Sequence, residues 1–401
     1  MLVESLTVGT KVRKDFLPFA LPKISEMEIA EVVDTLRSGW LSTGPKTKRF
    51  EEEFARYIGC KYAIAVNSCT AGLHLALLAC GIGPGDEVIV PTFTFAATAN
   101  VVVHCGARPV LADVGDDLNI KVSEIERLIT SRTKAIIPVH FAGKPCDLTE
   151  IHAIAQKHNL VVIEDAAHAV GAIYRGKKIG TISPITCFSF YPTKNMTTGE
   201  GGMVCTNDEK LAEKIRILSL HGISKDAWRR YTSQGSWYYE IYYPGYKYNM
   251  SDISAALGLV QLKRLDEFLR IRETYAREYT DAFSFLPEIT IPHRCFEPPI
   301  GGFKHSWHLY VILLNLEKLL INRAQFIEAL RYENIGASVH FIPLHLHPYY
   351  QKTYNYKPSS LPNAKWLYER IVSLPLYPKM SLSDVYDTIR AVIKIIRRMR
   401  K

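Results

Sequence analysis

A lone lysine separates two short apolar runs in the segment CFSFYPTKNMTTGEGGMVCT, residues 187–206. The runs Cys187–Phe190 and Met203–Thr206 are typical of buried strands, and Lys194 lies in the loop between them. A lysine held between core strands must lose water. Such a lysine is either ion-paired or has a lowered pKa, which makes its amine a nucleophile. The ordinary alternative is a loop lysine that faces solvent, so the neighbouring motifs must decide between the two interpretations.

A pair of carboxylates follows another apolar run. Leu160–Ile163 has the continuous apolar pattern of a strand buried on both faces, and Glu164 and Asp165 come directly after it. Open α/β sheets bind their ligands at the carboxyl ends of such strands. A carboxylate there suits a cationic ring nitrogen, because opposite charges in a dry cleft keep each other ionised. Asp165 could equally cap the next segment, and taken alone the two interpretations weigh the same.

Small hydroxyl residues begin the helical pattern that follows the strand-like run Tyr62–Val66. The sequence NSCTAG, residues 67–72, leads into Leu73–Cys80, and this helical pattern stops at Gly81. Such a helix start leaves backbone N–H groups free to hold a phosphate, although Ser and Thr also cap ordinary helices. A phosphate cradle, a ring-nitrogen carboxylate and a buried lysine are the three groups that pyridoxal 5′-phosphate (PLP) requires from a protein.

Eight blocks occur in the order typical of one family. They are SGWLSTGPKTKRFEEEFARYIG, VNSCTAGLHLAL, GPGDEVIVPTFTFAATAN, IIPVHFAG, VIEDAAHAVGA, FSFYPTKNMTTGEGG, PGYKYNMSDISAALG and SLPLYP. From about Phe16 to its last residue, the chain resembles the fold-type I PLP enzymes, and within them the DegT/DnrJ class of sugar-nucleotide aminotransferases. PGYKYN and FSFYPTKN look closest to the UDP-4-amino-4-deoxy-L-arabinose–oxoglutarate aminotransferases. The resemblance implies an α/β fold with a mostly parallel sheet between helices and a smaller C-terminal α/β domain.

The resemblance also implies cofactor-binding roles. Lys194 would bind the cofactor aldehyde covalently, and Asp165 would pair with the protonated pyridine nitrogen. Phe95 would stack on the ring, although it could be a core aromatic like its neighbour Phe93. His168 would lie near the ring's phenolic oxygen, where many relatives have glutamine; outside the family it would more often be a packing residue. The groups expected to hold the phosphate are Thr70, Ala71 and the hydroxyl of Ser189.

One block departs from the family pattern. Many relatives read GYNYRM, and their asparagine reaches across a dimer to the neighbouring cofactor phosphate. This chain has Lys247 in place of that asparagine and Asn249 in place of the arginine. A lysine can also bind phosphate as a point charge, so either residue could make the contact. The resemblance implies a homodimer with shared active sites.

Three histidines between residues 340 and 347 invite a metal assignment. Metal-binding histidines on a helix usually have carboxylates nearby and HxxxH-type spacing, and the prolines here break any such helix. We therefore expect no metal site. The resemblance places this loop near the sugar-binding cleft, although each residue could equally be structural. The expected substrate-binding residues are Thr43, His340, His345 and Tyr350.

Strand-like runs alternate with helical patterns from residue 62 to about residue 220, which favours a mostly parallel sheet covered by helices. The clearest strands are Val88–Val90, Pro109–Ala112, Ala135–Val139 and Leu160–Ile163. Helices are expected at Thr47–Tyr57 and at Asp252 to about Phe283. We expect a large PLP-binding domain at residues 1–255 and a small domain at residues 256–401. The aromatic segment Tyr231–Tyr248 is interpreted as a surface excursion that contacts the partner subunit.

The net charge is +9, from 49 basic and 40 acidic residues. A basic protein could bind nucleic acid, and the tail at residues 394–401 is rich in Lys and Arg. The tail also has apolar residues at helical spacing, which is typical of an ordinary amphipathic last helix: Val392, Ile395, Ile396 and Met399. The excess charge would equally attract anionic ligands such as a sugar nucleotide. We expect no nucleic-acid binding.

The sequence offers no signal for a membrane or an oxidising compartment. No run approaches the ~20 apolar residues that cross a bilayer, so we expect no membrane insertion. Residues 1–16 lack the charged-then-apolar order of a secretion signal. The eight cysteines form no CxxC pair, and several lie in apolar runs, as in a reduced compartment. We expect a cytoplasmic protein.

The resulting hypothesis is a PLP-dependent aminotransferase. L-glutamate would give its amino group and leave as 2-oxoglutarate, and a keto-sugar nucleotide would be the acceptor. The sugar would be a 4-keto pentose or a 4-keto-6-deoxyhexose, for cell-surface polysaccharide or a lipid A-type modification. A sugar dehydratase on the same fold is one alternative, and Lys194 counts against it because such relatives can carry histidine there. A non-catalytic regulatory relative is the other alternative.

Overall fold

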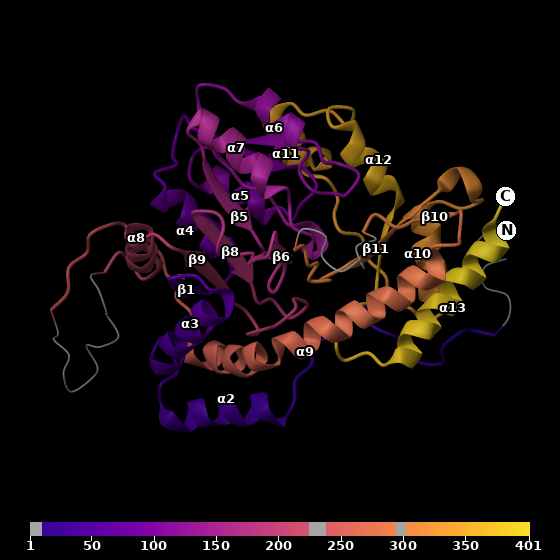
Figure 1. Ribbon diagram of the computed structural model, residues 1–401, viewed down its shortest axis with the longest axis horizontal. Helices are drawn as coiled ribbons and strands as arrows, with labels where there is room; N and C mark the ends of the chain where they lie inside the picture. The colour runs from indigo at the N-terminus through magenta and orange to yellow at the C-terminus, as the bar shows by residue number, and fades with distance from the viewer. Residues whose placement is uncertain (1–9, 224–237, 294–301) are drawn as a thin grey trace.

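The structure is a computed structural model that describes residues 10–223, 238–293 and 302–401. Its largest element is a seven-stranded sheet (Figure 1). In spatial order its strands are β1 (Tyr62–Val66), β9 (Gly202–Thr206), β8 (Ile185–Ser189), β5 (Val161–Asp165), β4 (Thr133–Ile136), β2 (Glu87–Pro91) and β3 (Arg108–Ala112). Strand β9 runs antiparallel to both neighbours, and all other adjacent pairs are parallel. The predicted α/β fold with a mostly parallel sheet is confirmed.

Alternate residues of these strands enter two different cores. In β1, Ala63 and Ala65 face one core, whereas Ile64 and Val66 face the other. Because successive side chains of a strand point to opposite faces, a continuous apolar run is buried on both sides. One face is covered by α3 (Pro45–Ile58), α6 (Val122–Leu128), α7 (Leu148–His158) and part of α9 (Asp252–Phe283). The other face is covered by α4 (Cys69–Ala79), α5 (Ala97–His104) and α8 (Glu209–Ser219).

Strand direction determines which residues meet at one edge of the sheet. Strands β1, β2, β5 and β8 all point the same way, so their carboxyl ends share an edge. That edge gathers Asp165 at the end of β5 and Ser189 at the end of β8. Gly202, where the oppositely directed β9 begins, lies at the same edge. Ligands of open α/β sheets bind at this edge.

A second, antiparallel sheet of three strands lies in the C-terminal part of the chain. Its strands are β10 (Ile289–Thr290), β11 (Tyr310–Leu314) and β12 (Ile371–Leu374). The remaining C-terminal helices are α10 (Arg323–Tyr332), α11 (Pro348–Tyr354), α12 (Pro362–Arg370) and α13 (Leu382–Met399). Helix α9 connects the two parts (Figure 1): Leu259 and Leu265 pack in the core of the large sheet, and Tyr279 and Phe283 in the core of the small sheet. The expected domain boundary at 255/256 falls inside this helix and stays a prediction.

Element boundaries differ from the predicted ones where distant side chains intervene. The helix expected at residues 47–57 begins at Pro45, because the Asp252 carboxylate accepts the N–H groups of Gly44, Lys46 and Thr47 (2.8 to 3.0 Å). The helix expected from residue 73 begins earlier, at Cys69. Strand β4 ends at Ile136 rather than at residue 139. The long helix Asp252–Phe283 and the amphipathic last helix, α13, are found where they were predicted.

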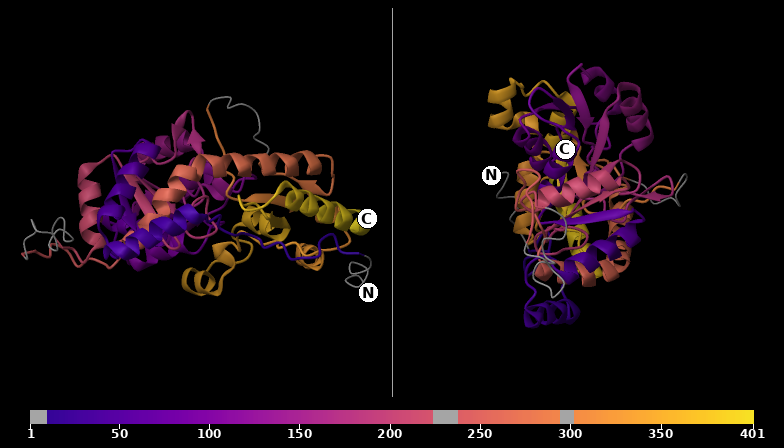
Figure 2. Two further views of the ribbon diagram at one scale, coloured as in Figure 1. Left: turned by 90° about the horizontal axis from the view of Figure 1, so that it is seen from below. Right: turned by 90° about the vertical axis from the view of Figure 1, so that its left-hand side faces the viewer.

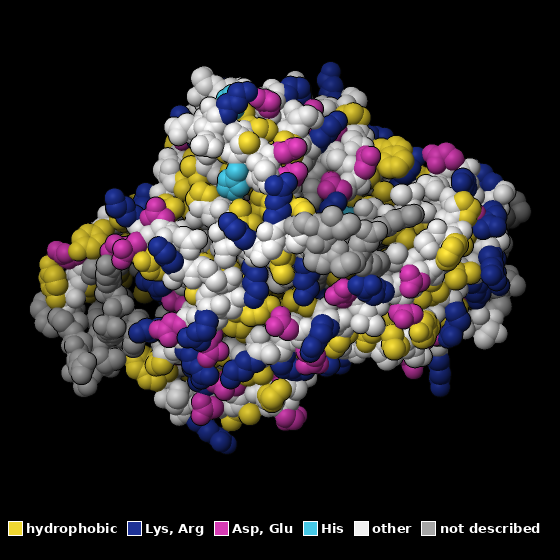
Figure 3. Space-filling model, viewed as in Figure 1, with side chains coloured by type: hydrophobic (Ala, Val, Ile, Leu, Met, Phe, Trp, Pro, Cys, Tyr) yellow, Lys and Arg dark blue, Asp and Glu magenta, His cyan; other side chains and the backbone are white. Residues whose placement is uncertain are grey.

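Helix α2 (Glu26–Ser38) lies at the outside of the molecule (Figures 1 and 2). The buried Glu28 carboxylate attaches it to α9, accepting from Arg264 (2.6 Å) and Gln261 (2.7 Å). The α2 side chains Met27, Ile29 and Leu36 are exposed. Figure 3 shows hydrophobic and charged side chains interspersed over this region. Helix α2 therefore exposes large apolar side chains on more than one of its faces.

Part of the predicted aromatic excursion is described. Its exposed large side chains are Tyr238, Tyr239, Ile241, Tyr242 and Tyr243. The predicted element continues at residues 231–237, with Trp237, which lie outside the described residues, as does Cys295. Within the described ranges, no helix combines the length and apolar character needed to cross a membrane.

Candidate active site

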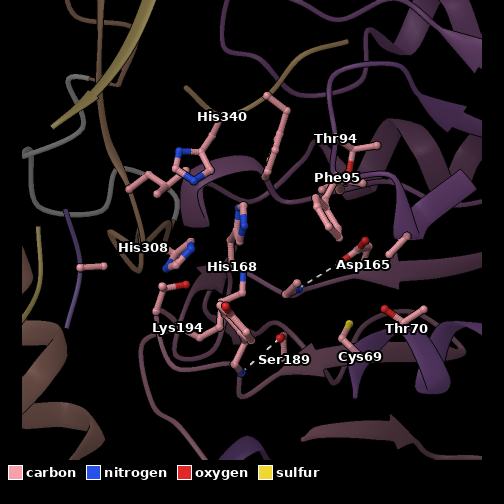
Figure 4. Close-up of a pocket in the computed structure, with 18 of the residues that line it drawn as sticks. Cys69, Thr70, Thr94, Phe95, Asp165, His168, Ser189, Lys194, His308 and His340 are labelled. Carbon is pink, nitrogen blue, oxygen red and sulfur yellow. Dashed lines mark hydrogen bonds between the residues drawn. The ribbon is translucent and has the colours of Figure 1, made fainter. Parts of the chain in front are cut away.

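A cavity of about 480 Å³ lies at the sheet edge where β5 and β8 end. Its opposite wall comes from the C-terminal part of the chain and includes Leu309, Leu374 and Leu376. Figure 4 shows side chains from both parts converging on the same space. Seven of the predicted site residues line the cavity: Thr70, Phe95, Asp165, His168, Ser189, Lys194 and His340.

Lys194 lies on a turn in the loop between β8 and β9, where its N–H donates to the carbonyl of Tyr191 (2.9 Å). Its side chain is half-buried in the cavity wall. Burial lowers the pKa of the Lys194 ammonium to about 8, and the Asp165 carboxylate opposes this shift without reversing it. A sizeable fraction of the side chain is therefore an uncharged, nucleophilic amine at mildly alkaline pH.

Asp165 is buried at the end of β5 and faces the cavity. Its Oδ2 accepts from the hydroxyl of Thr98 (2.8 Å), and its Oδ1 accepts from the N–H of Ala167 (3.1 Å). Burial raises the pKa of Asp165, whereas both hydrogen bonds and the Lys194 ammonium favour the charged form. The carboxylate thus caps the following backbone and also lines the cavity, so the two interpretations of this residue are compatible.

The N-terminus of α4 forms one corner of the cavity, with Ser68, Cys69 and Thr70 in its lining. The N–H of Ala71 donates to Ser68 Oγ (3.1 Å), and the Ala71 side chain is buried outside the lining. Gly202 lets β9 start against this corner, because a Cβ there would lie 2.6 Å from the Cys69 nitrogen.

The donors of this corner suit an anion. The hydroxyl of Thr70 lies in the cavity lining, and so does that of Ser189, which accepts from the N–H of Tyr191 (3.4 Å). A helix N-terminus flanked by hydroxyl groups is the arrangement that binds a phosphate. The amine of Lys194 and the carboxylate of Asp165 lie in the lining of the same cavity. These residues fit a ligand that has a phosphate, a reactive aldehyde and a basic ring nitrogen.

The two phenylalanines near the start of α5 have different environments. Phe93 is fully buried in a core cluster, whereas Phe95 is 64% exposed and lies over the cavity. The Phe95 ring is 6.1 Å from the ring of Phe341. Phe95 is therefore available to a planar ligand, and the core-aromatic interpretation applies to Phe93.

His168 is buried, and its environment determines where its proton lies. The N–H of Ala142 donates to His168 Nδ1 (3.2 Å), so Nδ1 carries no proton and the neutral ring has its proton on Nε2. Burial, with the neighbouring Lys194 ammonium, holds the pKa of His168 well below its ordinary value. His168 is thus a neutral hydrogen-bond donor at the cavity wall.

Two more imidazoles lie beside His168. The ring of His308 is 4.2 Å from it, and within the described residues His308 Nδ1 has no partner. His340 Nδ1 lies 2.9 Å from the hydroxyl of Ser373, and burial lowers the pKa of His340 to about 4. His308 was not predicted, because one histidine directly before an apolar strand carries no functional signal. Burial keeps all three rings uncharged at neutral pH.

Three of the four expected substrate-binding residues, Thr43, His345 and Tyr350, do not line the cavity, and two of these three are buried elsewhere. His345 is fully buried, and its Nδ1 is 2.9 Å from the hydroxyl of Thr92. Tyr350 is also buried, and its hydroxyl donates to Asn100 Oδ1 (2.6 Å). Both hydrogen bonds attach the 340–354 segment to the large sheet. In this structure these two side chains therefore have packing roles.

The departing block lies at a second cavity, of about 400 Å³, which Thr43 and Asn249 help to line. The exposed Lys247 donates from Nζ to Asn249 Oδ1 (2.6 Å). Asn249 Nδ2 donates to the hydroxyl of Thr43 (2.6 Å), which donates to the carbonyl of Met250 (2.6 Å). The polar atoms of Asn249 are thus occupied, whereas Lys247 presents its ammonium outward. Neither they nor Thr43 reach the first cavity.

Comparison with known families gives a match over nearly the whole chain. Residues 22–393 match the model of the DegT/DnrJ/EryC1/StrS aminotransferase family. The chain is 55% identical over 387 residues to the spore coat polysaccharide biosynthesis protein SpsC of Bacillus subtilis, covering 96% of this chain and 98% of SpsC.

Solved structures of similar proteins agree with this family assignment. Spr1654 of Streptococcus pneumoniae, which carries the provisional designation of a sugar aminotransferase, has a TM-score of 0.88 and 36% identity in both its PLP and PMP forms. In the PLP form the match covers 95% of this chain and 99% of that one. Helicobacter pylori PseC, an aminotransferase of pseudoaminic acid biosynthesis, has a TM-score of 0.88 and 32% identity, covering 96% and 100% of the two chains. The cofactor of this chain is PLP.

Proposed function

The chain belongs to the DegT/DnrJ/EryC1/StrS aminotransferase family, and from that premise we propose that it transfers the amino group of L-glutamate to the keto group of a nucleotide-linked sugar. A PLP-dependent aminotransferase acting on sugars is what the family and its solved members establish. The amino donor, the nucleotide and the sugar are parts of the proposal.

The observation that carries the proposal is the composition of the first cavity. An amine with a pKa of about 8, a buried carboxylate and a helix N-terminus with hydroxyl groups lie in the lining of one space. PLP, when bound, supplies an aldehyde that takes up amino groups and a ring that withdraws electrons from the carbon being deprotonated. The side chains of this chain bind and orient the reactants and move the protons.

We assign the covalent attachment of PLP to Lys194 Nζ. Whenever Nζ is not attached to the cofactor, it would be a free amine within the same cavity, able to take the proton from Cα of the amino donor. A pKa of about 8 suits both tasks, since general bases work best with a pKa near the operating pH. The walls of apolar side chains on the C-terminal side exclude water from this amine.

Three further residues orient the ring in this proposal. Asp165, fixed by Thr98 and by the backbone of the next turn, would hold a proton on the pyridine nitrogen. Phe95 would cover the ring, and His168, whose proton is on Nε2, would donate to the phenolic oxygen. The start of α4, with Thr70 and Ser189, would bind the phosphate.

The sugar is proposed to be a 4-keto sugar carried by a nucleotide. The blocks PGYKYN and FSFYPTKN favour a 4-keto pentose, as in the arabinose-type enzymes they resemble. The name of SpsC, which concerns a spore coat polysaccharide, supports a role in the synthesis of a surface polysaccharide. Among the described lining residues, Lys194 is the one lysine or arginine, and its lowered pKa leaves part of it uncharged, so the anionic nucleotide needs cations from elsewhere.

A homodimer supplies such cations in this proposal. Lys247 points outward from the chain, and Asn249 and Thr43 hold its ammonium in place. The exposed apolar side chains of α2 and the exposed aromatic side chains at 238–243 are groups that a second copy would cover. We propose that Lys247, and not Asn249, faces the cofactor phosphate of the partner, because the polar atoms of Asn249 already have partners.

The test offers the two half-reactions separately. L-glutamate added to the purified protein should change the absorbance of the cofactor and release one equivalent of 2-oxoglutarate per site. The protein so treated is then given a panel of UDP- and dTDP-linked 4-keto sugars, and products are identified by mass and NMR. An aminated sugar with all hydroxyls retained supports the proposal, whereas loss of a hydroxyl indicates a dehydratase. No conversion of glutamate, with PLP bound, would refute the choice of donor.

A further inference from the structure

Arg272 is a buried arginine outside the set of residues to which we have given a role. It lies on α9, the helix that connects the two sheets, and is 1% exposed. Lysines and arginines are rarely fully buried unless an acid pairs with them. Within the described part of the chain, no carboxylate forms an ion pair with Arg272, so its charge is uncompensated.

Backbone carbonyls take the place of that missing carboxylate. Arg272 Nη1 donates to the carbonyls of Leu376 (2.7 Å), His308 (3.2 Å) and Trp307 (3.3 Å), and Nη2 donates to the carbonyl of Lys194 (3.5 Å). Residues 307–308 precede β11, and residue 376 follows β12. One guanidinium therefore joins the turn that carries Lys194 to the two segments of the small sheet that form the opposite cavity wall.

Arg272 also acts on Lys194 electrostatically, through its positive charge. Burial lowers the pKa of Arg272 to about 9, so the guanidinium is still charged at neutral pH. A positive charge beside an ammonium favours loss of the proton from that ammonium. The pKa of Lys194 is lowered chiefly by burial, and the Arg272 charge adds to the lowering, against the opposing effect of Asp165.

We propose that Arg272 is a positioning residue for Lys194, which holds the Lys194 turn against the small sheet and favours the uncharged form of the Lys194 amine. This inference rests on the proposed role of Lys194. A buried, unpaired guanidinium lowers the stability of the fold. Burial would cost less free energy if a carboxylate paired with the guanidinium, or if an apolar side chain replaced it. The charge is useful where it is, because a compensating carboxylate would cancel its effect on Lys194.

Other titratable groups also face Lys194 from the elements around it. Those that line the cavity or whose charge acts on Lys194 are Asp165, Glu200, Cys69, Tyr191, His168, His308 and His340. Asp165 raises the Lys194 pKa, and the three imidazoles are uncharged at neutral pH. At neutral pH, Arg272 is thus the positive charge among the described groups that act on Lys194.

The test measures the protonation of Lys194 directly, in the full-length chain without cofactor. Trace acetylation with isotopically labelled acetic anhydride, followed by mass spectrometry of the Lys194 peptide, gives the labelling rate as a function of pH. Two variants remove the charge: Arg272→Gln keeps a hydrogen-bond donor, and Arg272→Met keeps only the apolar stem. The matched control is Arg370→Gln, a buried arginine that pairs with Glu317 and does not line the cavity.

Both Arg272 variants should shift the labelling midpoint of Lys194 upward from about pH 8 and slow labelling below the midpoint about three- to tenfold, as removal of one poorly screened charge requires. Arg272→Met should also increase amide hydrogen exchange at residues 191–198, and Arg370→Gln should change neither measurement. An unchanged midpoint in folded Arg272→Gln and Arg272→Met would overturn the inference.

If circular dichroism shows that both variants fail to fold, the natural chain still decides. A buried charge is poorly screened, so the midpoint should stay near pH 8 between about 0.05 and about 1 M sodium chloride. A midpoint near pH 10, or one that rises with salt, would contradict the inference. Because no amino donor is present, the result is independent of the test with L-glutamate, and either proposal can fail alone.

Discussion

The two cavities differ in how completely one chain builds them. At the first cavity, the carboxylate of Asp165, the ring of His168 and the turn of Lys194 all find their partners within the chain. Beside the second cavity, Lys247 is exposed, and in the described structure its ammonium has one hydrogen-bond partner, the Asn249 side chain. A single fold thus assembles the lining of the first cavity, whereas the outward-facing ammonium of Lys247 would meet a cofactor only in the proposed dimer.

The origin of this difference lies in the sheet. The carboxyl ends of parallel strands meet at one edge, so residues far apart in sequence are brought together by backbone hydrogen bonds alone. The Lys247 segment instead follows exposed side chains at residues 238–243, and its ammonium is positioned by a side chain, that of Asn249. Variants of the first region should therefore have large effects in every state of the protein, and variants of the second should depend on assembly.

The largest effect is expected for Lys194→Ala. Loss of both the covalent anchor and the proton-transferring amine should lower turnover by at least about 10³-fold. Steady-state amination with L-glutamate and an accepted keto-sugar nucleotide measures this. The control is Lys144→Ala, which removes a lysine paired with Asp117 outside the first cavity and should leave turnover unchanged. Normal turnover in Lys194→Ala would mean that the reactive centre lies elsewhere.

Asp165→Asn comes next. The amide has the same shape but no charge to hold a proton on the ring nitrogen, so kcat should fall about 10²- to 10³-fold, as for loss of one preorganised electrostatic group. Asp113→Asn is the matched control, because Asp113 is also buried and binds backbone N–H groups after a strand, away from the cavity. Equal losses in the two variants would show that Asp165 contributes only to folding.

The three uncharged imidazoles at the first cavity, those of His168, His308 and His340, predict that the stability of the fold depends on pH. The unfolded chain binds a proton at the ordinary pKa of histidine, near 6.5, whereas burial lowers the pKa of His340 to about 4. The folded state therefore loses stability as the pH falls from about 6.5 towards about 4, by about 2 kcal/mol at pH 5 for this residue alone. Urea unfolding at pH 7.5 and pH 5 should show a smaller loss in His340→Asn. The same loss in both chains would show that His340 is exposed or already charged.

The smallest effect is expected at the second cavity. Lys247→Met should weaken PLP binding about tenfold, the usual worth of one hydrogen bond to a charged group, and only in the assembled protein. Titration of the cofactor-free chain with PLP gives Kd, and Lys61→Met, an exposed lysine lining the same cavity, is the control. If Asn249→Ala weakened binding and Lys247→Met did not, the roles of the two residues would be exchanged.

The sequence predicted the parts of the site that local patterns determine. Lys194 lies between two apolar runs, and Asp165 ends a strand whose buried character is evident from composition, so both could be placed from periodicity. The start of α4 could be found from its small hydroxyl residues. The roles of Phe95 and His168 came from the family resemblance, since a single aromatic or histidine carries no pattern of its own.

Local sequence patterns could not predict contacts between residues that are far apart in the chain. His345 and Tyr350 read as polar loop residues, but they are buried against Thr92 and Asn100, whose positions only the assembled fold defines. His308 and Arg272 act across the interface between the two sheets, and nothing in their own segments indicates a partner. The early start of α3 depends likewise on Asp252, which is about 200 residues away in sequence.

The most direct test of the account is to find the side chain that binds PLP. Borohydride reduction of the PLP-loaded protein, followed by proteolysis and mass spectrometry, identifies the lysine to which the cofactor becomes permanently attached. The account predicts a single modified peptide that contains Lys194. Modification of another lysine, or a protein that remains colourless and unlabelled after incubation with PLP, would contradict it.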